Sequence, residues 1–242
     1  KFGSSEAAKV GDWVMASGNP FGLGGTVTVG IISAKARDIN SGPYDDYLQT
    51  DAAINKGNSG GPLFNMDGDV VGVNTAIISP TGGSIGIGFA VPADTVVNII
   101  EQLKQYGEVR RGWLGVRLAS ITDELATQLG LKDNNGAHVA SVAKTGPAAA
   151  AGIETDDVIV RFDNQDITAM RILPRIVAQT PVGKSVSVDV LRKGQRRTLK
   201  VVVGRLADDE APTPAELGAP QSDERKLLGL KIAPLSDALR KQ

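Results

Sequence analysis

Asn55-Lys56-Gly57-Asn58-Ser59-Gly60-Gly61-Pro62-Leu63 is the stretch that decides the fold. It holds a serine between glycines, in a predicted loop between two short apolar runs. Such a loop exposes a hydroxyl for nucleophilic attack. The glycines let backbone N–H groups turn inward, where they can stabilise the oxyanion of an acyl-transfer intermediate. The stretch predicts Ser59 as nucleophile and the N–H groups of Gly57, Asn58 and Ser59 as the oxyanion hole. The alternative is a glycine-rich hairpin loop with an incidental serine.

The composition is that of an ordinary globular protein, with 41% hydrophobic and 22% charged residues among 242, enough for one or two domains. Basic and acidic residues number 26 and 27, so bulk charge does not indicate nucleic acid or an anionic membrane as a partner. Cysteine is absent, which excludes disulfides and thiol catalysis. The sequence predicts no membrane span and no signal peptide. Because it opens at Lys1 without a methionine, we expect a non-native N-terminus.

The first part of the chain predicts short strands separated by turn residues, a pattern typical of a β-barrel. A helix is expected to follow Pro92 and to end at Gly107. Val96, Ile100 and Leu103 would form the apolar stripe of that helix, with which it packs. The predicted strands cover residues 13–16, 26–36, 47–50, 63–64, 70–78 and 85–91.

The second part mixes short strands and helices and resembles a bacterial-type PDZ domain. The stretch from Ala151 to Ile159, with Ala-Gly-Ile followed by Asp-Val-Ile, carries most of this resemblance. Thr122 and Thr168 are the expected caps of two helices. The predicted elements are strands at 113–116, 137–142 and 156–163, helices at 122–129, 146–153 and 168–179, and a hairpin of 186–191 with 198–203.

Four motifs in this order resemble the HtrA/DegP family of trypsin-like serine proteases with PDZ domains. They are Asn19–Gly24, Gln49–Asn55, the serine loop Gly57–Pro62 and Gly86–Pro92. The resemblance implies a mostly β chain, the second half of a trypsin-like double β-barrel followed by an α+β PDZ domain. The expected divisions are the end of the protease domain at 1–111, a PDZ domain at 112–205, a linker at 206–224 and the start of a possible second PDZ domain at 225–242.

The resemblance also implies a function. The family comprises serine endopeptidases of protein quality control that degrade misfolded polypeptides, bind C-terminal peptides and form trimer-based homo-oligomers. It implies a periplasmic location and no cofactor or metal. Ile54, Ile77 and Ile87 would line a shallow apolar specificity pocket, the alternative being ordinary barrel core. Arg37 and the polar loop that follows it would be a mobile regulatory element, the alternative being a plain surface arginine.

A trypsin-like site also needs a histidine base and an aspartate, which precede the serine in this fold. The one histidine, His138, lies far downstream in a predicted PDZ strand, and we interpret it as structural or surface. Lys56 as a substitute base is an alternative, although a side chain three positions upstream usually points away. We therefore expect the chain to begin near the second barrel, to carry only the nucleophile and to be inactive alone.

A second function of a different class stays open: a peptide-binding or chaperone module without proteolysis. The main chain of Leu114-Gly115-Val116 would receive a terminal carboxylate. The peptide would add as a strand, and Ile172 and Ile176 on the adjacent helix would help to form its side-chain pocket. A histidine and an aspartate upstream in the parent gene would favour the protease.

Overall fold

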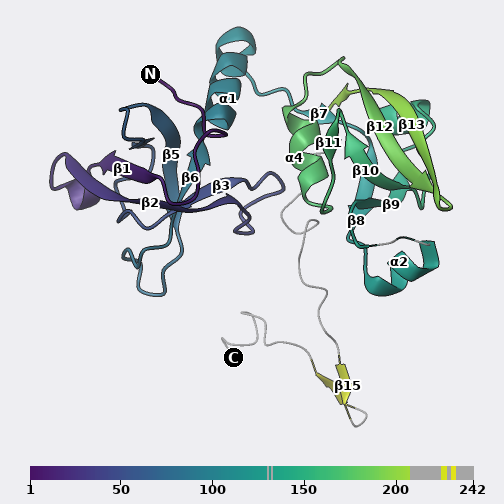
Figure 1. Ribbon diagram of the computed structural model, residues 1–242, viewed down its shortest axis with the longest axis horizontal. Coiled ribbons are helices and arrows are strands. Elements are labelled where there is room, and N and C mark those ends of the chain that lie inside the picture. Colours follow the sequence, from purple (N-terminus) through teal and green to yellow (C-terminus); the bar gives the residue numbers. More distant parts are fainter. Residues whose placement is uncertain (130, 132, 208–224, 228–229, 233–242) are drawn as a thin grey trace.

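The computed structural model describes residues 1–129, 131, 133–207, 225–227 and 230–232. Its first half is a closed antiparallel barrel in the order β1-β2-β3-β6-β5-β4, and its second half is a twisted antiparallel sheet with helices (Figure 1). The predicted fold class, mostly β with a barrel and a PDZ domain, is confirmed. The barrel strands are β1 (Trp13–Gly18), β2 (Thr26–Arg37), β3 (Tyr47–Thr50), β4 (Pro62–Phe64), β5 (Val70–Ile77) and β6 (Gly88–Pro92).

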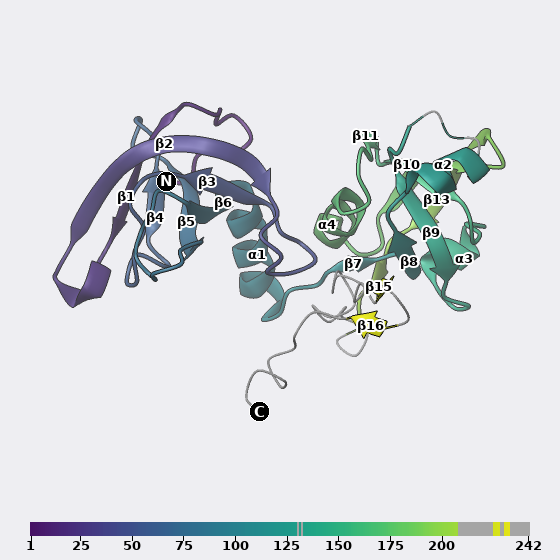
Figure 2. The same ribbon diagram turned by 90° about the horizontal axis from the view of Figure 1, so that it is seen from below.

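Alternating residues of the barrel strands point inward and form one apolar core. The long strand β2 curves over the barrel in Figure 2, and its pairing with β3 shifts register twice, between Ile32 and Ala34 and between Ala34 and Arg37. Such bulges bend a strand and help a small sheet to close. The buried core residues are Val14, Ala16, Ile32, Ala52, Ile54, Leu63, Val71 and Ala90.

The first residues of the chain are tied to the barrel. The N–H of Val70 donates to the carbonyl of Lys1 at 3.0 Å, and the N–H of Gly3 donates to the carbonyl of Val70 at 2.9 Å. The buried Ser5 hydroxyl donates to the Asp94 carboxylate at 2.7 Å and accepts the Asp94 N–H at 3.2 Å. Since Pro92 offers no side-chain cap to the following helix, Ser5 supplies one from a distant part of the chain.

Helix α1 (Ala93–Tyr106) ends at Gly107, which adopts φ 72° as a left-handed C-cap, as predicted. Its predicted packing stripe is wrong in part. Ile100 and Leu103 are 36% and 46% exposed, so only the N-terminal end of the helix is covered by the barrel. Periodicity identifies the apolar face of a helix but not whether a neighbour covers it.

The PDZ domain is built on a sheet in the order β13-β12-β10-β9-β8, with β11 paired to β10. Its core is continuous, and Phe162, Ile159 and Val188 are completely buried within it. The strands are β7 (Gly112–Trp113), β8 (Val116–Ala119), β9 (Ala137–Val142), β10 (Val158–Phe162), β11 (Gln165–Asp166), β12 (Ser185–Arg192), β13 (Gln195–Val202) and β14 (Gly204–Arg205), and the helices are α2 (Asp123–Leu129), α3 (Pro147–Ala150) and α4 (Ile172–Gln179).

One of the two predicted helix caps is confirmed. The Thr122 hydroxyl accepts the N–H of Leu125 at 3.3 Å and caps α2. Thr168 does not cap α4, because the chain first makes tight turns in which Ile172 N–H bonds to the carbonyl of Ala169 at 3.1 Å. Helix α4 therefore begins four residues later than predicted.

The predicted linker lies almost wholly outside the described residues. Of the possible second PDZ domain, only β15 (Arg225–Leu227) and β16 (Leu230–Ile232) are described, and they pair as an antiparallel hairpin. Across the described part of the chain, no helix is long and apolar enough to cross a bilayer.

Candidate active site and peptide site

Ser59 is exposed on the loop between β3 and β4. Its hydroxyl donates a hydrogen bond to the carbonyl of Thr75, on β5, at 3.1 Å. The predicted nucleophile thus stands at the surface of the barrel, beside the last residues of β5. Sequence reasoning missed Thr75, because nothing in the sequence pairs the two segments.

Two glycines of this loop, Gly57 and Gly61, meet backbone where a side chain would lie. Gly57 adopts φ 107°, and a Cβ there would fall 2.2 Å from the carbonyl oxygen of Asn19. A Cβ on Gly61 would fall 2.1 Å from the carbonyl oxygen of Ser17. The turn after β1 also bonds to the serine loop, since Asn19 N–H donates to the Gly57 carbonyl at 3.1 Å. Two predicted motifs, the Asn19–Gly24 loop and the serine loop, therefore pack against each other through their backbones.

Asn58 lies in the centre of the loop with 1% of its surface exposed. Its N–H donates to the carbonyl of Asn55 at 3.0 Å, and its carbonyl accepts the N–H of Gly61 at 2.9 Å. The Asn58 N–H predicted for the oxyanion hole is therefore used inside the loop. The other two predicted donors are the N–H groups of Gly57 and Ser59.

The three isoleucines predicted for a specificity pocket differ in burial. Ile54 is 1% exposed and belongs to the barrel core. Ile77 and Ile87 are partly buried, and the N–H of Ile78 donates to the carbonyl of Ile87 at 3.1 Å, which brings their two segments side by side. Ile77 also packs against the barrel core that contains Ile54.

Among the described residues, neither His138 nor Lys56 makes a hydrogen bond with Ser59. His138 lies on β9 in the PDZ domain, where its Nε2 contacts the Asp156 carboxylate at 3.1 Å, in agreement with a structural role. Lys56 is exposed, and the hydrogen bond of the Ser59 hydroxyl goes to Thr75 instead. Among the residues that the structure describes, there is also no cluster of side chains that could hold a metal ion.

The predicted carboxylate-binding segment lies between β7 and β8. Gly115 adopts φ 77°, and a Cβ there would lie 3.1 Å from the Trp113 ring and 3.2 Å from Gly146. The carbonyls of Leu114 and Gly115 accept the N–H groups of Ala148 and Ala143, both at 2.8 Å. With its carbonyls held in this way, the segment can turn N–H groups toward a ligand.

Helix α4 carries the two isoleucines predicted for the peptide pocket. Ile172 is partly buried against the PDZ core, and Ile176 is 7% exposed within it. Ile172 therefore has more surface to offer a ligand than Ile176.

The loop between β2 and β3, predicted to be mobile, is held by one carboxylate. Asp45 accepts the N–H groups of Ile39 at 3.0 Å and Ser41 at 2.8 Å, and the Ser41 hydroxyl at 2.7 Å. Arg37, predicted to be regulatory, donates from Nε to the Gln49 side chain at 2.8 Å. A carboxylate with three donors gives a polar loop an ordered internal structure.

The same loop contacts the PDZ domain through ion pairs that sequence reasoning missed. Arg171 lies 3.2 Å from Asp38, and Arg175 on α4 forms an ion pair with Asp46. The Arg111 guanidinium stacks over the Tyr44 ring at 5.3 Å, and burial raises the pKa of Tyr44. The four-residue spacing of the two arginines fits one helix face, but it does not identify the two aspartates of the polar loop as their partners.

Family models and curated relatives agree with this architecture. A trypsin-like peptidase domain matches residues 1–73, and a PDZ domain matches residues 112–203. A "Probable periplasmic serine endoprotease DegP-like" of Rhizobium meliloti (strain 1021) is 47% identical over 98% of this chain and 48% of its own length. A relative with the same name from Pseudomonas fulva (strain 12-X) is 44% identical over 100% of this chain and 50% of its own length. The chain spans about half the length of the curated relatives it matches. Their names confirm the predicted periplasmic location.

Solved structures agree as well. The HtrA-type protease AlgW with a tripeptide matches with a TM-score of 0.74 and 45% identity, over 86% of this chain and 69% of that one. The serine endoprotease from Yersinia pestis matches with a TM-score of 0.56 and 36% identity, over 83% and 64%. The chain has a closed barrel that presents a serine between glycines, followed in the sequence by a PDZ domain. Together with these relatives, this shows that the chain belongs to the HtrA/DegP family of trypsin-like serine proteases with PDZ domains.

Proposed function

We propose that the protein is a serine endopeptidase of protein quality control, in which Ser59 attacks the scissile carbonyl of unfolded polypeptides. The observation that carries the proposal is the exposed Ser59 hydroxyl on a loop in which Gly57 and Gly61 admit no side chain. The N–H groups of Gly57 and Ser59 would bind the oxyanion, since that of Asn58 is engaged within the loop.

Substrate preference follows from the apolar side chains beside the serine. A shallow pocket of Ile54, Ile77 and Ile87 would favour valine, alanine or isoleucine before the cut. An arginine or lysine there would bury its charge without a partner.

The test separates the nucleophile from its activation. Ser59 without a base stays a neutral hydroxyl, a weak nucleophile at its free pKa. Loss of a triad member leaves a residual acceleration of about 10³–10⁴-fold over water. We expect the 242-residue chain neither to cut unfolded casein nor to react with a fluorophosphonate at a protease-like rate. At its full natural length, the protein should do both, and Ser59→Ala should abolish both. Rapid labelling of the 242-residue chain would mean that it contains a base, with Lys56 the first to test.

Peptide binding by the PDZ domain is the second candidate function, and the backbone arrangement of Leu114-Gly115-Val116 favours it. The domain would take a peptide with a free apolar C-terminus by strand addition. The affinity should be modest, on the order of micromolar, because binding orders a flexible peptide. A labelled peptide that ends in valine should bind more tightly than its amidated form. Equal affinity of the two forms would contradict capture of the carboxylate.

The contacts between the two domains support a regulatory role for Arg37 and its loop. The loop is joined to α4, beside the proposed peptide pocket, through Arg171 and Arg175. Arg37 at the start of the same loop bonds to Gln49 on β3, the strand that leads into the serine loop. A bound peptide that shifts α4 would thereby change the geometry at Ser59 through Arg37.

The proposed assembly is a trimer-based homo-oligomer.

A further inference from the structure

Two buried asparagines lie on either side of the nucleophile, and the proposed reaction uses neither of their side chains. Asn58 is 1% exposed and Asn74 is 0% exposed. Asn58 directly precedes Ser59, and Asn74 directly precedes Thr75, whose carbonyl accepts the serine hydroxyl. Burying a carboxamide is costly unless its donors and acceptors find partners, so the partners of both side chains are informative.

Asn74 holds the residues that follow the nucleophile. Its N–H donates to the Gly61 carbonyl at 2.9 Å, and its carbonyl accepts the Gly60 N–H at 2.8 Å. Its side-chain Nδ2 donates to the Pro62 carbonyl at 3.2 Å. One residue of β5 therefore fixes three consecutive residues after Ser59.

Asn58 holds the residues that precede the nucleophile. Its N–H donates to the carbonyl of Asn55, and its side-chain Nδ2 donates to the Ala53 carbonyl at 3.3 Å. The same Ala53 carbonyl accepts the Thr28 hydroxyl at 2.9 Å, which ties this anchor to β2. A Cβ on Gly18 would fall 2.5 Å from Asn58 Oδ1, so the side chain is enclosed from the β1 side too.

The carbonyl partners determine how both carboxamides are oriented. Each NH₂ group faces a backbone carbonyl, and the reversed orientation would place two acceptors against each other. The Oδ1 atoms of Asn58 and Asn74 consequently lie buried with no hydrogen-bond partner in the described residues. Buried oxygens without a donor are rare in native proteins and call for a specific explanation.

We propose that Asn58 and Asn74 are positioning residues that hold Ser59 and the oxyanion-binding N–H groups in reactive geometry from opposite sides of the loop. This inference rests on the proposed endopeptidase function. It explains why the fold keeps two buried carboxamides beside the reactive hydroxyl. Apolar side chains would leave the carbonyls of Ala53 and Pro62 without these donors and the loop without two of its anchors.

Aspartate in place of either asparagine gives a test that depends on protonation. A neutral Asp side chain is the same size, and its O–H can donate to the same carbonyl. An ionised one presents only acceptors to that carbonyl, and burial should raise its pKa. Each variant should therefore position the nucleophile at low pH and misplace it at high pH.

The experiment measures the rate constant for fluorophosphonate labelling of Ser59, with the protein at its full natural length and between about pH 5 and pH 8, where a raised carboxyl pKa falls. For Asn58→Asp and Asn74→Asp we expect a rate about 10²-fold below wild type at the upper end, the size of effect that a small misplacement causes. The ratio of variant to wild-type rate should rise toward one as the pH falls. With a peptide substrate, the loss should lie in kcat and not in KM.

Asn65→Asp is the matched control in the same barrel. Asn65 Oδ1 accepts the N–H groups of Asp67 at 3.0 Å and Asp69 at 2.9 Å, and a carboxylate can accept both. Its labelling ratio should stay at one at every pH. A ratio of one for both Asn58→Asp and Asn74→Asp, or a loss that does not change with pH, would overturn the inference.

Asn74→Thr keeps the inference testable if an aspartate variant unfolds. Threonine is neutral, suits a strand and offers a shorter hydroxyl donor. We expect several-fold slower labelling at all pH values, with an unchanged melting temperature. Labelling at the wild-type rate would overturn positioning by Asn74. If the wild-type protein itself is not labelled, the proposed function fails, and this inference fails with it.

Discussion

The barrel and the PDZ domain bury apolar surface to different extents. In the PDZ domain, Val182 and Val202 are the large apolar side chains that are exposed among the described residues. The barrel half exposes many more, among them Trp13, Val27 and Val29. These three lie on one face of the β1–β2 hairpin, where Trp13 pairs with Ile31 and Val29 with Met15.

The PDZ domain therefore buries nearly all of its large apolar side chains, whereas the barrel half offers an apolar contact surface. A contiguous exposed apolar patch on a soluble protein usually marks an interaction site or a liability to associate. We therefore expect the barrel half, and not the PDZ domain, to drive any self-association of this chain. The barrel has a buried core and backbone contacts around the serine loop, and the PDZ domain has a larger continuous core and the ion pair of Asp157 with Arg192.

The largest expected effect comes from a substitution in the serine loop of the barrel. Gly57→Ala places a Cβ against the carbonyl of Asn19 at a positive φ, so the serine loop must move. Loss of one oxyanion donor lowers kcat by about 10²–10³-fold. We expect a fall of that size in fluorophosphonate labelling of the full-length protein, with peptide affinity of the PDZ domain unchanged.

Gly60→Ala is the control for that substitution. Gly60 also has a positive φ, at 87°, but a Cβ added there would meet no atom within 4 Å, so only local backbone strain is added. Labelling that falls equally in both variants would show that strain, and not the contact with Asn19, is responsible.

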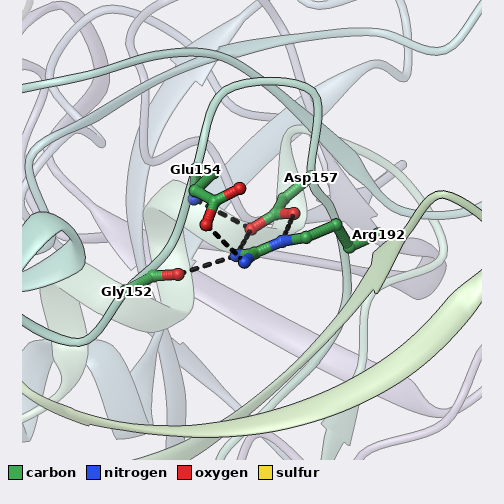
Figure 3. Close-up of polar contacts among 4 residues, drawn as sticks. All are labelled: Gly152, Glu154, Asp157 and Arg192. Atoms are coloured by element: carbon green, nitrogen blue, oxygen red, sulfur yellow. Dashed lines mark hydrogen bonds and ion pairs between the residues drawn. The ribbon is translucent and has the colours of Figure 1, made fainter.

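The second prediction concerns a buried ion pair of the PDZ domain. Asp157 is completely buried, and Arg192 holds it with two hydrogen bonds of 2.7 Å and 2.8 Å while also contacting Glu154 and the Gly152 carbonyl (Figure 3). Arg192→Met leaves the Asp157 charge buried and unpaired, which costs about 3–5 kcal/mol. Amide hydrogen exchange, measured segment by segment, should show loss of protection in β9, β10 and β12, with the barrel unaffected.

The exposed arginine on the neighbouring strand gives the matched control. The Arg196 side chain is 55% exposed and pairs with Asp189 at 2.7 Å. The Asp189 side chain is 14% exposed, but it keeps the Thr198 hydroxyl as a donor at 2.6 Å. Arg196→Met should therefore cost less than Arg192→Met, about 1 kcal/mol. Equal losses of protection in the two variants would contradict the distinction between the buried and the exposed pair.

How much of the structure could be predicted from the sequence depends on how far apart in the chain the interacting residues lie. The strands and helices follow from local patterns, and Ala137–Val142 is found with the predicted bounds. Ser59 could be proposed as the nucleophile from the sequence because its glycines stand next to it in the chain. The acceptor Thr75 and the anchor Asn74 could not, because they reach the serine only through the pairing of distant strands.

The contact between the domains was also beyond sequence reasoning. Asp38 and Asp46 look like ordinary solvated charges in a polar loop, and Arg171 and Arg175 like the polar side of a helix. Only the folded arrangement places the two pairs opposite each other. The exposure of Ile100 could not be predicted either, because an apolar periodicity identifies one face of a helix but not whether another element covers it.

The smallest expected effect concerns the link between the two halves. Arg175 and Asp46 are partly buried, so reversing one charge introduces repulsion, and exchanging both restores attraction. In a double-mutant cycle of Arg175→Asp and Asp46→Arg, we expect a coupling of about 1 kcal/mol, the upper range for surface ion pairs, in peptide-stimulated labelling of the full-length protein.

Arg37→Ala should lower the same stimulation while leaving peptide affinity unchanged, because Arg37 bonds to Gln49 on the barrel side and not to the PDZ domain. Raising the salt concentration should weaken the coupling between the charges but not the effect of Arg37→Ala. Stimulation that is unaltered in all of these variants would remove the loop as the connection, and the two halves would then act on substrates independently.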